Sequence, residues 1–131
     1  MPNRRRFHFL AAGLLALAAS TPWAAETRTY SDQEFDRLTA AGRPVVLDVH
    51  ATWCPTCKAQ KPIIDALLAQ PAYRDVTLLT IDFDSAKPTL RRFKVAGQST
   101  LIAFKGRGEV ARSVGDTSRE GLEALFAKSV R

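Results

Sequence analysis

The sequence predicts an α/β domain with a mixed four-stranded sheet and helices on both faces. Short apolar runs rich in β-branched residues alternate with segments of helical periodicity, and the last two runs are joined by a glycine turn. Strands that are separated by helices pair in parallel through right-handed crossovers, whereas a hairpin adds an antiparallel strand. The 131 residues suffice for one such domain and a short extension.

The expected strands are short and bounded by turn residues. Buried strands are predicted at 44–50 (PVVLDVH), 76–83 (VTLLTIDF) and 99–105 (STLIAFK). The glycines of the segment 106–108 turn the chain into a fourth strand at 109–114.

Four helices are expected between and around these strands. The first begins at a capping box of Ser31 with a glutamate three residues later and ends at Gly42. The segment 54–70 carries an apolar stripe at helical spacing, and 85–95 is a shorter helix with a proline in its first turn. A second capping box at Thr117 predicts the start of the last helix.

The N-terminus has the pattern of an export signal, which divides the chain into a signal at 1–25 and a domain at 26–131. Three arginines at 4–6 precede an apolar run at 10–19 that is too short to span a bilayer. We expect a Sec-type signal, with a twin-arginine signal and an uncleaved membrane anchor as alternatives. The expected location is the periplasm, with no stable membrane span after processing.

The charge balance argues against nucleic acid as a partner. The formal net charge is +6, but three of its positive charges lie in the predicted signal. The basic residues Arg91, Arg92 and Lys94 lie close together, and we interpret them as a solvated helix face.

Two cysteines, Cys54 and Cys57, lie three positions apart. A disulfide that closes so short a loop stabilises the fold by about 2 kcal/mol, against about 3 kcal/mol for a 15-residue loop. The pair is therefore better suited to reversible redox chemistry than to holding the fold together. A zinc site needs four ligands, and His50 is the one further candidate in the predicted domain. Lys58 follows the pair, which excludes a CxxCH haem site, so we expect no metal and no cofactor.

The position of the cysteine pair predicts the role of each thiol. Cys54 follows a buried strand and begins a helix, whose first amides lack partners and carry a partial positive charge. Such a site lowers a cysteine pKa, so Cys54 is the expected nucleophile. Cys57 lies one turn later and is expected deeper against the core, where it keeps its proton until it resolves the mixed disulfide.

These residues resemble the thioredoxin family. The segment 53–57, WCPTC, is similar to the family's WCGPC, and Asp48 matches its buried acid. Pro62 matches the proline that kinks the active-site helix in the family. The Ile-Asp pair at 81–82 matches the end of a family strand, and the segment 104–109 is similar to the family's hairpin. The resemblance covers nearly all of the predicted domain and implies a thioredoxin-like fold and thiol–disulfide oxidoreductase activity. The CPTC sequence is similar to the thioredoxins of cytochrome c maturation, which are exported reductants.

Asp48 and His50 are expected on one face of the sheet because side chains alternate along a strand. A carboxyl group in a buried strand is unfavourable unless it is paired or has a function. We predict that Asp48 accepts the proton of Cys57. The alternative is a structural acid that is hydrogen-bonded to the backbone or to a polar neighbour. His50 replaces the family's second tryptophan and either tunes the site or is a half-exposed strand-end residue. Leu78 replaces the lysine that often partners the acid.

A substrate-docking surface is predicted around the cysteines, formed by Trp53, Pro55, Thr56, Ser99 and Thr100. Ser99 stands where the family has a cis-proline. A cis bond before another residue costs about 2.5–4 kcal/mol, so we expect a trans bond there. The serine amide and hydroxyl are expected to offer hydrogen bonds to a thiolate or to a bound peptide.

The predicted function is that of a periplasmic thiol–disulfide oxidoreductase that reduces the disulfides of exported proteins. Its electrons would come from a transmembrane thiol donor. Two alternatives remain open at this point: an exported disulfide oxidase or isomerase, and a non-catalytic binding module for cysteine-containing partners.

Overall fold

The computed structural model describes residues 24–131, so the predicted signal at 1–25 lies almost entirely outside the described residues. The elements follow in the order β1 (Glu26–Thr29), α1 (Asp32–Ala40), β2 (Val45–His50), α2 (Pro55–Leu68), a 3₁₀ turn (Pro71–Tyr73), β3 (Thr77–Asp82), α3 (Lys87–Arg92), β4 (Thr100–Lys105), β5 (Gly108–Val114) and α4 (Arg119–Val130).

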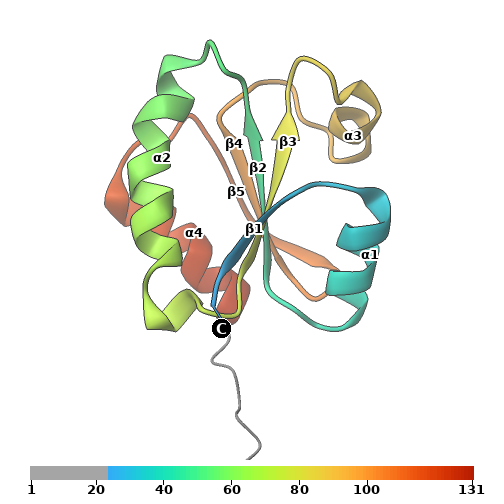
Figure 1. The fold of residues 1–131 in the computed structure, drawn as a ribbon, viewed down its shortest axis with the longest axis vertical. Coiled ribbons are helices and arrows are strands. Elements are labelled where there is room, and N and C mark those ends of the chain that lie inside the picture. The colour runs from blue at the N-terminus through green and yellow to red at the C-terminus, as the bar shows by residue number, and fades with distance from the viewer. Residues whose placement is uncertain (1–23) are drawn as a thin grey trace, which may run out of the picture.

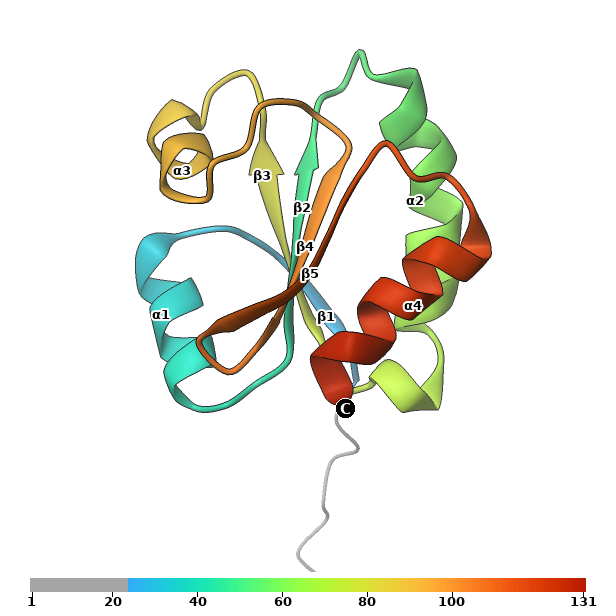
Figure 2. The same ribbon diagram turned by 180° about the vertical axis from the view of Figure 1, so that it is seen from behind.

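The described chain forms one mixed sheet with the strand order β1-β3-β2-β4-β5. Strands β1 and β2 both run parallel to β3, whereas β4 is antiparallel to β2 and to β5. Helices α2 and α4 cover one face of the sheet, and α1 and α3 cover the other (Figures 1 and 2). The α/β class and the mixed sheet are therefore confirmed, but the sheet has five strands rather than four.

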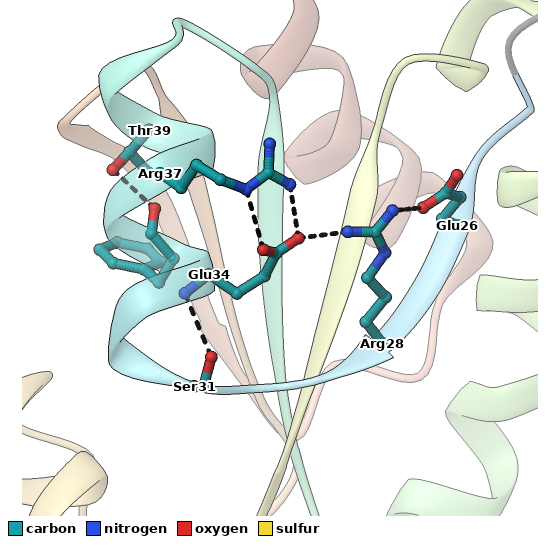
Figure 3. A network of polar contacts seen from close by, with 7 residues as sticks. Glu26, Arg28, Ser31, Glu34, Arg37 and Thr39 are labelled. Atoms are coloured by element: carbon teal, nitrogen blue, oxygen red, sulfur yellow. Dashed lines mark hydrogen bonds and ion pairs between the residues drawn. The ribbon is translucent and has the colours of Figure 1, made fainter.

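The missing strand is β1, which the sequence pattern does not reveal because all four of its residues are exposed. Its backbone pairs with β3, and its side chains join a polar network on α1 (Figure 3). Arg28 bonds both Glu26 and Glu34, and Arg37 donates to Glu34 over 2.8 and 3.0 Å. Backbone pairing with the distant β3 and a polar network with the nearby α1, and not an apolar run, therefore place this edge strand.

The helix ends follow the predicted caps with one exception. Ser31 accepts a hydrogen bond from the amide of Glu34, and Gly42 adopts a positive φ of 73° after α1. At α4, however, Ser118 is the N-cap and accepts from the amide of Gly121. The prediction of Thr117 at this position is wrong by one residue.

Two apolar clusters fill the faces of the sheet. One packs under α1 and α3 and is rich in aromatic rings, and the other packs under α2 and α4. Strand β2 lies in the middle of the sheet and contributes residues to both clusters. Its carboxyl end leads into α2 beside the loop that precedes β4, and the chain ends at the opposite end of the sheet (Figure 1).

Candidate active site

Cys54 is the N-cap residue of α2 and lies at the end of the loop that follows β2. Its sulfur accepts a hydrogen bond from the amide of Cys57 over 3.1 Å, so it occupies the place that a serine or aspartate oxygen usually takes at a helix start. Pro55 begins the helix, where its missing amide hydrogen is not needed. Both cysteines are free thiols.

The two thiols differ in acidity. Burial acts to raise the pKa of Cys54, but hydrogen bonds from Cys57, Ser99 and the backbone amides of Cys57 and Thr56 outweigh it and lower that pKa. Burial and the hydrogen bond with Cys54 raise the pKa of Cys57. Cys54 is therefore the more acidic thiol of the pair, and Cys57 is the thiol that holds its proton more tightly.

The exposure of the two cysteines is the reverse of the sequence-based expectation. Cys54 is only 1% exposed, whereas Cys57 is half-buried and borders a pocket. Solvent exposure therefore does not follow the expected depth of the two sulfurs, although Cys57 is the cysteine surrounded by more protein atoms. The side chain of Ser99 lies against the Cys54 sulfur and contributes to its burial.

Ser99 bridges the cysteine pair. Its hydroxyl oxygen lies 3.1 Å from the sulfur of Cys54 and 3.2 Å from the sulfur of Cys57. The residues from 24 to 131 contain no cis peptide bond, so the bond before Ser99 is trans, as expected. Ser99 has a φ of 61°, a left-handed conformation that is uncommon for a residue with a side chain.

The backbone groups of Ser99 are already bonded within the fold. Its amide donates to the carbonyl of Val49 over 2.8 Å, and its carbonyl accepts from the amide of Gly115 over 3.0 Å. The expectation that this amide serves a thiolate or a bound peptide is therefore wrong, and the hydroxyl alone reaches the sulfurs.

Asp48, His50 and Cys57 border one pocket of about 430 Å³ on the α2 side of the sheet. Burial raises the pKa of Asp48, whereas the charges of His50 and Lys61 act in the opposite direction. Hydrogen bonds are not among the causes of this shift within the described residues. Asp48 borders the pocket, and its two interpretations, as a proton acceptor or as a structural acid, stay predictions.

His50 ends β2 on the same face as Asp48, as the strand alternation predicts. Its Nδ1 atom is buried and has no partner among the described residues. The tuning role of His50 stays a prediction.

The predicted docking residues divide into exposed and buried ones. Trp53 is 53% exposed, Pro55 is exposed and Thr56 is half-buried, so these three form an accessible rim. Ser99 and Thr100 are buried, and the Thr100 hydroxyl donates to the carbonyl of Gly97 over 2.7 Å. Thr100 thus stabilises the loop that precedes β4.

Two residues of the site were missed by sequence reasoning. Gln60 is 1% exposed, and its amide nitrogen donates to the carbonyls of Asp116 and Ser99, which ties α2 to the Ser99 loop. The sequence does hold a signal for Gln60, because it is a polar residue at a helical position that faces the core. Asp84 accepts a hydrogen bond from the indole of Trp53 over 2.8 Å. Nothing in the sequence pattern joins these two residues, which lie 31 positions apart.

Neither a metal site nor a membrane span is found among the described residues. This part of the chain brings together no group of three or more histidine, cysteine or carboxylate side chains suited to a metal ion. None of the helices between residues 24 and 131 is long and apolar enough to cross a membrane.

Comparisons with known proteins agree with this fold and site. The family model described as Thioredoxin matches residues 26–128. A thioredoxin of Chlamydia trachomatis is 37% identical over 98 residues, which are 75% of this chain and 93% of that protein. Thioredoxin-2 of Saccharomyces cerevisiae is 37% identical over 68% of this chain and 85% of its own length.

Solved structures give the same result. The crystal structure of Trxlp from Edwardsiella tarda is 43% identical and superposes with a TM-score of 0.74, covering 79% of this chain and 98% of that one. Thioredoxin NaTrxh from Nicotiana alata is 29% identical with a TM-score of 0.70, covering 87% of this chain and 99% of its own. Together with the thiolate at the start of α2, these matches identify the chain as a thiol–disulfide oxidoreductase that belongs to the thioredoxin family.

Proposed function

We propose that this protein is exported to the periplasm and there reduces disulfide bonds of other exported proteins. The observation that carries the exchange chemistry is the Cys54 sulfur at the N-cap of α2, where hydrogen bonds lower its pKa. Export is supported by the arginines and the apolar run of the predicted signal.

The first step is nucleophilic attack by the Cys54 thiolate on a substrate disulfide. The substrate S–S bond breaks, a mixed disulfide forms on Cys54, and one substrate sulfur leaves as a thiolate. Cys57 then loses its proton and attacks the Cys54 sulfur, which releases the second substrate thiolate. Two electrons pass to the substrate, and the protein is left with a Cys54–Cys57 disulfide.

Asp48 is the group that we assign to receive the Cys57 proton. Both residues border the same pocket, and burial raises the pKa of Asp48, which makes its carboxylate a better proton acceptor. A pocket of about 430 Å³ has room for water molecules that bridge the two groups.

Substrate docks on the exposed rim of Trp53, Pro55 and Thr56. The indole of Trp53 offers an apolar surface of fixed orientation because Asp84 holds its nitrogen. A transmembrane thiol donor would then return two electrons to the oxidised pair, because the periplasm is an oxidising compartment.

The second candidate is an exported disulfide oxidase. One observation favours it: hydrogen bonds to the Cys54 thiolate stabilise the reduced protein, and a stabilised reduced form makes the disulfide a stronger oxidant. The reductase and the oxidase use the same chemical steps but run them in opposite directions.

The deciding experiment measures the redox state of the pair in growing cells. Cells are quenched in acid, free thiols are labelled with a maleimide of high mass, and the protein is analysed in the periplasmic fraction. We expect the protein in that fraction with both thiols mainly free. A mainly oxidised pair would reverse the direction, and a protein confined to the cytoplasm would refute export.

A further inference from the structure

The Ser99 hydroxyl occupies the gap between the two redox-active sulfurs. Its oxygen lies 3.1 Å from the Cys54 sulfur and 3.2 Å from the Cys57 sulfur. A hydroxyl has one hydrogen to donate and two lone pairs that accept. From this position the hydroxyl can donate its one hydrogen to either sulfur.

The rest of the fold fixes this hydroxyl in place. Ser99 is 3% exposed, its amide is bonded to Val49, and its carbonyl is bonded to Gly115 and to the side chain of Gln60. Bonds from three separate segments thus hold the left-handed backbone conformation of Ser99. Because these bonds already fix the residue, its hydroxyl can contact a thiolate with little further loss of conformational freedom.

We propose that Ser99 is a catalytic residue whose hydroxyl donates its hydrogen bond to whichever of the two sulfurs carries the negative charge. This inference rests on the proposed exchange reaction and adds a donor that follows the charge from Cys54 to Cys57.

The hydrogen bonds change in a definite order while protons and electrons stay balanced. In the reduced protein the hydroxyl and the Cys57 thiol both donate to the Cys54 thiolate. When the mixed disulfide forms, the negative charge leaves with the first substrate thiolate, and the hydroxyl hydrogen loses its charged acceptor. Cys57 then gives its proton to Asp48, and the hydroxyl turns to donate to the new thiolate. Ser99 itself gains and loses nothing.

The same hydrogen bond sets the redox balance of the pair. Neither sulfur is charged in the Cys54–Cys57 disulfide, so the hydroxyl stabilises the reduced form more than the oxidised one. Consistent with this, the hydrogen bond with Ser99 acts to lower the pKa of each thiol, although burial and Cys54 raise the pKa of Cys57 overall. The titratable neighbour that contacts Cys54 is Cys57, so the hydroxyl is the main side-chain donor from outside the pair.

The test compares Ser99→Ala and Ser99→Gly with wild type and with Ser113→Ala. Both Ser99 variants remove the hydroxyl, and glycine also accepts the positive φ without strain. Ser113 lies opposite Leu101 on the neighbouring strand and its buried hydroxyl has no partner among the described residues, so it is the matched control.

Two quantities are measured on the full chain. The pKa of Cys54 comes from the pH dependence of its alkylation rate by iodoacetamide, and the redox equilibrium comes from titration with glutathione buffers. Loss of a hydrogen bond to a charged group should raise the Cys54 pKa by about one unit. It should also shift the equilibrium toward the disulfide by about tenfold, or about 30 mV to lower potential. Ser113→Ala should change neither quantity.

A Cys54 pKa and a redox equilibrium that match wild type in both Ser99 variants would overturn the inference. Alkylation needs no disulfide substrate, so this result is independent of the proposed function. The proposed function fails instead if wild-type protein does not reduce the disulfides of insulin, whatever the Ser99 variants do to the pKa.

Discussion

The main-chain amide of Ser99 donates a hydrogen bond to the carbonyl of Val49 over 2.8 Å, while Ser99 holds a φ of 61°. Proline lacks that hydrogen and fixes φ near −65°, so neither feature survives in Ser99→Pro. We expect this variant to lose about 3 kcal/mol or more of unfolding free energy. Chemical denaturation followed by circular dichroism measures the loss.

Ser99→Gly is the control, because it keeps the amide and tolerates the positive φ. If Ser99→Pro is as stable as wild type, the loop before β4 has taken up a different backbone conformation around the proline, and the bond to Val49 is not what stabilises this loop.

Asp48→Asn should make the protein more stable at neutral pH and should slow the attack of Cys57 on the mixed disulfide. Burial raises the pKa of Asp48 in the folded state, so folding favours its protonated form. The contribution of Asp48 to the stability of the wild type is therefore fully present below the unfolded pKa of about 3.9 and is lost as pH rises through the folded pKa. The gain from Asp48→Asn should appear at pH 7 and vanish near pH 4.

The matched control is Asp75→Asn, which removes an exposed carboxylate outside this pocket. Its effect on unfolding should stay within about 0.5 kcal/mol. Resolution is followed as the decay of a mixed disulfide after stopped-flow mixing. If the mixed disulfide of Asp48→Asn decays at the wild-type rate across the pH range, Asp48 has a structural role and does not accept the proton.

His50→Phe should move the pH profile of resolution. The charge of His50 lowers the pKa of Asp48 within the shared pocket, so its removal should raise that pKa further. The rate of mixed-disulfide decay should then reach half of its maximum at a higher pH than in wild type. An unshifted profile would mean that His50 is only a half-exposed residue at the strand end.

Asp84→Ala should weaken substrate capture more than it weakens the fold. The Asp84 carboxylate accepts the indole hydrogen of Trp53 over 2.8 Å at the exposed rim. The loss of one such bond costs about 1 kcal/mol of stability, whereas the freed indole loses its fixed orientation. We expect a smaller rate of mixed-disulfide formation and a lower fluorescence anisotropy of tryptophan. Asp75→Ala, at an exposed position outside the site, should match wild type in both measurements.

The sequence pattern predicts the parts of this fold whose cause is local. Strand β2 is a short run of mainly apolar, β-branched residues, and the start of α2 is marked by Pro55 after a capping position. The position of Cys54 at the helix start, and hence the direction of its pKa shift, follows from these two local signals.

The parts that escape prediction depend on distant partners. Strand β1 has no apolar face, and its pairing with β3 joins residues about fifty positions apart. The positive φ of Ser99 requires bonds to Val49, Gln60 and Gly115, which come from three different elements or loops. The coverage of Cys54 by Ser99 follows from that backbone conformation, so it could not be predicted from the CxxC motif.

The different roles of the two cysteines are the central claim, and a trapping experiment tests them most directly. Cys57→Ala lacks the resolving thiol, so exported proteins should accumulate as covalent complexes on Cys54. Cys54→Ala keeps only the thiol whose pKa is raised, so it should trap almost nothing. Both variants are expressed at equal levels, quenched in acid and compared on non-reducing gels. Abundant complexes with Cys57→Ala and few with Cys54→Ala are the predicted result, and equal trapping by the two variants would contradict it.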